Sequence, residues 1–107
     1  MLTRPTHAGR HVYYPADLRD AKSHDRCWNA IQTRLVRDGV LHPILVGYWS
    51  IRILKWLPEV ADALELALTM AADFAKGGLK ADLVIGAHKT MIRYDQLSLT
   101  SLYRFTR

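Results

Sequence analysis

Basic side chains recur along residues 15–38 at a spacing that could bind phosphate. Plotted at about 100° per residue, five of them gather on one side of a helix: Arg19, Lys22, Arg26, Arg34 and Arg37. Guanidinium groups neutralise phosphates and bind them in a bidentate manner, so this face predicts contact with nucleic acid. Four aspartates in the same segment leave it with one net positive charge. A solvated helix face with ordinary ion pairs is therefore the alternative.

A second basic patch lies near the C-terminus, where Arg93 and Arg104 adjoin aromatic residues. Bases stack on exposed aromatic rings while arginine holds phosphates, a pattern typical of proteins that bind single-stranded nucleic acid. In a strand, however, Tyr103 and Phe105 share one face and Arg104 takes the other. A half-buried strand explains the same pattern.

Asp20, His24 and Cys27 have a spacing that would bring a carboxylate, an imidazole and a thiol onto one side of a helix. These groups are zinc ligands, and a Cys–His pair can act as nucleophile and base. No fourth ligand has matching spacing, and a free cysteine also packs as a small hydrophobic residue. Metal binding or thiol catalysis is therefore the third hypothesis for this chain.

Large apolar residues predict a protein interface. Trp49 and Trp56 lie close together, and Met70 and Phe74 lie on a helix whose apolar face is unusually wide. Tryptophan is common at the centres of interfaces, so we expect a homodimer or another protein partner. The alternative is that these side chains fill the core.

Composition limits the class of protein. The 107 residues include 15 Lys and Arg against 10 Asp and Glu, one cysteine, and 50% hydrophobic residues. One domain with its own core is expected, with no internal disulfide and no membrane span, since a span needs about 20 apolar residues. Without a secretory signal, a cytoplasmic location is expected.

Two helices can be read from their ends. Pro15 and Gly39 bound the first, with two shorter helices split near residue 22 as the alternative. Pro58 and Gly77 bound the second, over residues 58–76.

The remaining segments favour strands. Residues 40–57 are rich in β-branched and aromatic side chains, which predicts one or two strands with a bend near Gly47, although a buried helix fits the same apolar run. Short apolar and alternating runs over 83–85, 90–94 and 97–105 also predict strands. Residues 1–11 are predicted to form a flexible basic arm.

We therefore expect an α+β fold, a single domain over residues 12–107 with two main helices packed on a small, mostly antiparallel sheet. The first functional hypothesis is a non-enzymatic basic protein that contacts nucleic acid. The second is a structural or protein-binding subunit that forms a homo-oligomer. No phosphate-binding loop, GxGxxG, HExxH or GxSxG motif occurs in the sequence, so no cofactor and no catalytic residue is expected.

Overall fold

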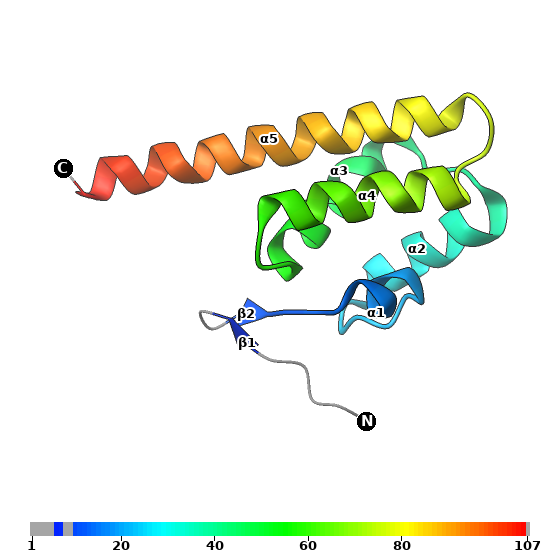
Figure 1. The fold of residues 1–107 in the computed structure, drawn as a ribbon, viewed down its shortest axis with the longest axis horizontal. Coiled ribbons are helices and arrows are strands. Elements are labelled where there is room, and N and C mark those ends of the chain that lie inside the picture. The colour runs from blue at the N-terminus through cyan, green and yellow to red at the C-terminus, as the bar shows by residue number, and fades with distance from the viewer. Residues whose placement is uncertain (1–5, 8–9, 107) are drawn as a thin grey trace.

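A computed structural model of the chain describes residues 6–7 and 10–106, with side chains for residues 12–95. Helices dominate this part of the chain (Figure 1). They are α1 (Pro15–Arg19), α2 (Arg26–Asp38), α3 (Pro43–Trp56), α4 (Val60–Phe74) and α5 (Leu79–Thr106). Strands within the described residues are limited to β1 (Thr6–His7) and β2 (Arg10–His11), which pair antiparallel. The predicted flexible arm falls partly on residues 1–5 and 8–9, which lie outside the described residues.

The predicted α+β fold is wrong, because helices occupy the segments expected to form the sheet. Most of residues 40–57 form α3, the helix that was the alternative. It contacts α2, α4 and α5, so apolar side chains are needed on more than one side of it and no single stripe forms. β-branched residues favour strands because they fit a packed surface, and the tightly packed surroundings of α3 meet the same requirement.

The last third of the chain is helical rather than β. Leu83, Ala87 and Met91 are buried at i, i+4 and i+8, which places them on one side of α5. That side lies along α3 and α4, and Figure 1 shows α5 running beside α4 for most of the length of α4. Of the short apolar run at residues 83–85, only Leu83 lies on this side, and Ile85 is 55% exposed. The run therefore resembled a strand without marking the buried face of the helix.

The two helices predicted from their ends are present, the first of them divided. Gly39 ends α2 in the left-handed conformation (φ 73°), and its N–H donates to the Leu35 carbonyl. α1 ends at Arg19, and α2 starts after Asp25, so the split near residue 22 occurs. α4 follows Pro58 by two residues and ends at Phe74.

One core joins the four longer helices. Trp28 of α2, Trp49 of α3, Met70 of α4 and Met91 of α5 are each completely buried. Trp28 and Trp56 meet edge to face, with ring centroids 5.4 Å apart. Such a contact contributes about 0.5–1.5 kcal/mol beyond the apolar area that it buries. Within the described residues, no helix has both the length and the apolar character needed to cross a membrane.

Candidate functional site

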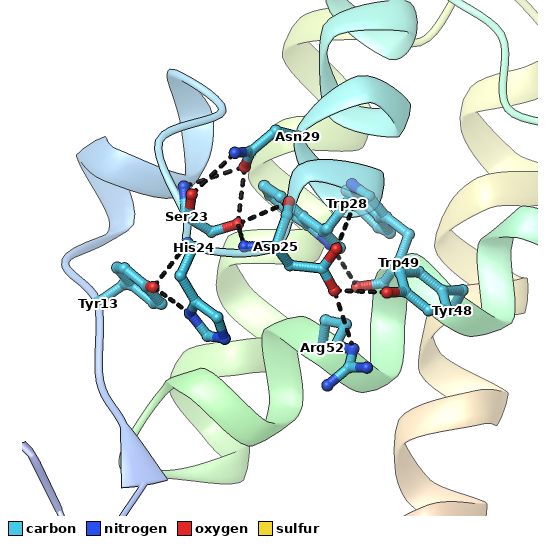
Figure 2. A network of polar contacts seen from close by, with 9 residues as sticks. All are labelled: Tyr13, Ser23, His24, Asp25, Trp28, Asn29, Tyr48, Trp49 and Arg52. Carbon is cyan, nitrogen blue, oxygen red and sulfur yellow. Dashed lines mark hydrogen bonds and ion pairs between the residues drawn. The ribbon is translucent and has the colours of Figure 1, made fainter.

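Asp25 connects the start of α2 to α3 through a network of polar contacts (Figure 2). Its Oδ1 accepts a 3.0 Å hydrogen bond from the backbone N–H of Trp28, which caps the helix. Its Oδ2 accepts a 2.5 Å hydrogen bond from the hydroxyl of Tyr48 and lies 3.3 Å from Nε of Arg52. Tyr48 and Arg52 are one helical turn apart on α3, so both reach the same carboxylate.

These contacts fix the charge of the carboxylate. Burial by itself raises the pKa of Asp25, but the hydrogen bonds from Tyr48 and the Trp28 amide, together with the charge of Arg52, hold that pKa below its ordinary value of 3.8. The hydrogen bond to Asp25, aided by burial, raises the pKa of Tyr48 above 10.0. At neutral pH Asp25 is therefore a fixed negative charge with both oxygens occupied.

The loop before α2 is held by two further pairs. Ser23 and Asn29 exchange hydrogen bonds, with the Ser23 hydroxyl donating to Oδ1 of Asn29 over 2.7 Å and the Asn29 amide donating to the Ser23 carbonyl over 2.8 Å. The Tyr13 hydroxyl is hydrogen-bonded to Nδ1 of His24 and also accepts from the His24 backbone N–H. Both rings contact Trp56 edge to face. The loop between α1 and α2 is thus attached to the core.

The completely buried side chain of Gln32 makes hydrogen bonds inside the core. Its Oε1 accepts from Nε1 of Trp49 over 2.9 Å, and its Nε2 donates to the Arg19 carbonyl over 3.3 Å. Trp28 in turn donates its indole N–H to the Trp49 carbonyl over 3.1 Å. The indole N–H groups of Trp28 and Trp49 are therefore both satisfied, which keeps these two tryptophans in fixed positions.

The basic residues predicted to bind nucleic acid have different surroundings. Arg19 is engaged within the fold, because its guanidinium bonds to Asp73 over 2.6 Å and lies over the ring of Phe74. Lys22 is exposed in the loop before α2, and Arg93 is exposed on α5. Arg104 lies in the last turns of α5, where the structure describes no side chain.

Arg26, Arg34 and Arg37 come together on the outer face of α2. With Asn29, Ala30 and Thr33 they line an open hollow of about 560 Å³. The side chains of Arg34 and Arg37 are 64% and 69% exposed. Three of the predicted basic residues thus share one accessible surface.

The residues predicted to form a protein interface are mostly internal. Trp49 and Met70 are completely buried, and Trp56 is 4% exposed, whereas Phe74 is half-buried against Arg19. These side chains pack in the core of a single copy of the chain, as the alternative interpretation had it. The homodimer stays a prediction.

Asp20, His24 and Cys27 do not share a helix face. Asp20 directly follows α1, His24 lies in the loop before α2 with its ring against Tyr13, and Cys27 is exposed on α2. Among the described residues, no group of three potential metal ligands is close enough to hold an ion.

Sequence reasoning missed Asp25, Tyr48, Arg52 and Gln32. The i,i+4 spacing of Tyr48 and Arg52 would have indicated a shared partner if residues 40–57 had been treated as a helix. Asp25 was counted only as a charge, although an aspartate just before a helical run is a common N-cap. Gln32 carries no sequence signal, because its role depends on the tryptophan of another helix.

Several known proteins are similar to this chain over part of its length, although no family model matches it. A protein from Potorous tridactylus is 34% identical over 76 residues, which cover 71% of this chain and 14% of the relative. A protein from Oryza sativa subsp. japonica is 38% identical over 58 residues, or 54% of this chain and 12% of the relative. A protein from Methanothermobacter thermautotrophicus is 38% identical over 56 residues, or 52% and 13%. Each of the three is a deoxyribodipyrimidine photo-lyase.

The chain is similar to one part of a photo-lyase. It spans 12–14% of the length of these curated relatives, so the similarity concerns a segment and not the whole enzyme. Because the relatives are lyases, the prediction of a non-enzymatic binding protein is wrong. Composition could not reveal this, since no motif in the sequence carries the similarity in a recognisable form.

Proposed function

We propose that this chain is a helical segment of a light-dependent DNA repair lyase of the photo-lyase type. The observation that carries the proposal is its similarity to photo-lyases from an animal, a plant and an archaeon, at 34–38% identity over 56–76 residues. The names of those relatives specify deoxyribodipyrimidine as the group acted on. We therefore propose DNA that contains such paired pyrimidines as the substrate, and a cytoplasmic location stays a prediction.

The fixed interior of α2 and α3 supports a structural contribution to an active site. Asp25 is held from three sides, and Gln32 positions the indole of Trp49. Side chains locked by packing and hydrogen bonds hold a site to the geometry that catalysis requires. In this proposal the segment supplies that fixed wall, and the catalytic chemistry belongs to the complete enzyme.

A chimera tests the proposal. The aligned segment of the Potorous tridactylus relative is replaced by this chain, and the light-dependent repair of an ultraviolet-irradiated thymine oligonucleotide is measured against the same sample kept in the dark. We expect repair in light only, at a rate within about tenfold of the parent enzyme, since a shift of about 1.4 kcal/mol in the barrier accounts for tenfold.

Two controls make the result decisive. A relative with the segment deleted should show no repair, and circular dichroism establishes that the chimera is folded. If the chimera misfolds, the same chain is added in trans to the deleted relative. A folded chimera without light-dependent repair contradicts the proposal.

A further inference from the structure

The outer face of α2 presents three arginines to solvent along one open hollow. Arg26, Arg34 and Arg37 line it together with the small side chains Ala30 and Thr33. Positions 26, 30, 33, 34 and 37 recur at the period of an α-helix, so their side chains project to the same side. The residues that line the hollow all belong to α2, and none of them lies in a loop.

The charge of this hollow is only partly balanced within the fold. Asp38 lies 3.7 Å from Nε of Arg34 and 3.0 Å from Nε of Arg37, so one carboxylate serves two guanidinium groups. The side chain of Arg26 makes no hydrogen bond or ion pair with any residue that the structure describes. The charge of Asp25 is paired with Arg52 of α3, 3.3 Å away, and not with Arg26. Three positive charges therefore face one negative charge.

The other arginines of the helical core show the contrast. Arg19 is bonded to Asp73 and covered by Phe74, and Arg52 is paired with Asp25 and stacked on Tyr48. These two residues stabilise contacts between elements. Arg26, Arg34 and Arg37 do not connect α2 to another element in the described part of the chain, which leaves them available to a ligand.

The spacing of the three arginines fits a strand of nucleic acid. At a rise of about 1.5 Å per residue, Arg26 and Arg37 are separated by about 16 Å along the helix axis. Double-stranded DNA rises about 3.4 Å per nucleotide step along its axis, so an α2 laid along that axis would span about five steps. The small residues between the arginines leave room for a phosphate chain to approach the helix.

We propose that the hollow along α2, lined by Arg26, Arg34 and Arg37, binds the phosphate backbone of DNA. The choice of DNA as the ligand rests on the proposed function. The hollow adds the place on this chain where that DNA binds.

The proposed contacts are with phosphates and not with bases. One N–H of the Asn29 amide donates to the Ser23 carbonyl, and the Thr33 hydroxyl donates to the Asn29 carbonyl over 2.8 Å. Phosphate contacts position DNA without reading its sequence. Binding through the hollow should therefore depend little on sequence and strongly on salt.

The experiment measures binding of the full chain to a fluorescein-labelled duplex by anisotropy over a range of salt concentrations. In the test variant Arg26, Arg34 and Arg37 are all replaced by Gln. The plot of log affinity against log salt has a negative slope, and each lost phosphate contact reduces the magnitude of that slope by about 0.9. The magnitude should therefore be about 2.7 smaller in the variant. Between about 50 and 200 mM salt the wild type should lose roughly 40-fold more affinity than the variant.

A matched control removes two charges from another helix. Lys80 and Lys89 are exposed on α5, and replacement of both by Gln should leave the slope within about 0.9 of the wild type. The double variant R34Q/R37Q should reduce the magnitude of the slope by about 1.8. The single variants R26Q, R34Q and R37Q, each checked by circular dichroism, show the effect even if the triple variant is less stable. Each should reduce the magnitude of the slope by about 0.9.

Four results would overturn the proposal. The first two are an absence of DNA binding at low salt and an unchanged slope in the α2 variant. The third is a reduction of the slope in the α5 control equal to that in the α2 variant. The fourth is competition by poly-glutamate as strong as that by unlabelled duplex, which would indicate an acidic protein as the partner. The chimera test is separate, because repair can fail while the α2 variant still changes DNA binding as expected. That combination would refute the proposed function and retain the hollow.

Discussion

Asp25 performs two physical roles that single substitutions can separate. Its Oδ1 caps α2, and its Oδ2 holds Tyr48 and Arg52 of α3, with the side chain only 14% exposed. Asparagine retains a cap acceptor but removes the charge, whereas alanine removes both. Loss of the cap alone costs about 0.5–2 kcal/mol.

We predict that D25N is less stable than the wild type by about 1 kcal/mol at neutral pH, the usual contribution of one buried hydrogen bond. The pKa of Asp25 in the folded protein lies below 3.8. Because the unfolded chain then binds more protons, stability from this charge is complete above the unfolded pKa and is lost as pH falls through the folded pKa. The difference between D25N and the wild type should therefore shrink from about pH 5 downward. Urea unfolding at several pH values measures it.

D25A provides the comparison. It should remain less stable than D25N at every pH, because the missing cap does not titrate. A difference between D25N and the wild type that stays constant down to low pH would show that the charge of Asp25 contributes nothing to folding.

At the scale of the elements, the ends of helices were predictable and the interior segments were not. Pro15 begins α1 and Gly39 ends α2 through local backbone chemistry, which is legible in the sequence, and Pro58 lies two residues before α4. Pro43 lies in the first turn of α3, but the apolar run that follows it fits a strand or a buried helix equally well, and contact with three other helices decides between them.

The same difference applies to the candidate site. The basic face of α2 was visible because helical spacing alone brings Arg26, Arg34 and Arg37 together. The Asp25 network was not, because it joins two helices that only the tertiary structure places side by side. For α5, the buried spacing of Leu83, Ala87 and Met91 was available, but shorter apolar runs matched a strand equally well.

Two mid-helix glycines test how closely α3 and α5 approach. A Cβ at Gly86 of α5 would lie 3.1 Å from Cγ1 of Val46, whereas a Cβ at Gly47 of α3 would meet nothing within 4 Å. We predict that G47A stabilises the protein by about 0.8–1.0 kcal/mol through helix propensity. G86L should destabilise it by about 1–3 kcal/mol through overpacking.

Thermal unfolding monitored by circular dichroism measures both changes. A change of about 1 kcal/mol in the free energy of unfolding corresponds to a shift of about 4–8 °C in Tm for a domain of this size. V46A should recover part of the loss in G86L, because it removes the methyl groups that the larger side chain meets. An increase in Tm for G86L would contradict the described contact between α3 and α5.

At the scale of the whole molecule, the core is shared by α2, α3, α4 and α5 and should unfold as one unit. All three tryptophans of the chain, Trp28, Trp49 and Trp56, lie in it and are at most 4% exposed. A segment that spans 12–14% of its relatives would be expected to depend on the rest of the enzyme. Because the four helices share one core that encloses all three tryptophans, we expect instead that the segment holds its own structure.

We therefore predict that tryptophan fluorescence and far-ultraviolet circular dichroism report one coincident unfolding transition in urea, with a slope of about 1–3 kcal/mol per molar. Iodide should quench the folded protein very little and the unfolded chain strongly. The variant I44W supplies an accessible indole as a control, since Ile44 is 79% exposed. Its added fluorescence should be quenched without unfolding. Strong quenching of the unaltered protein in its folded state would show that the tryptophans are not enclosed, and that the isolated chain lacks the core on which its fixed site depends.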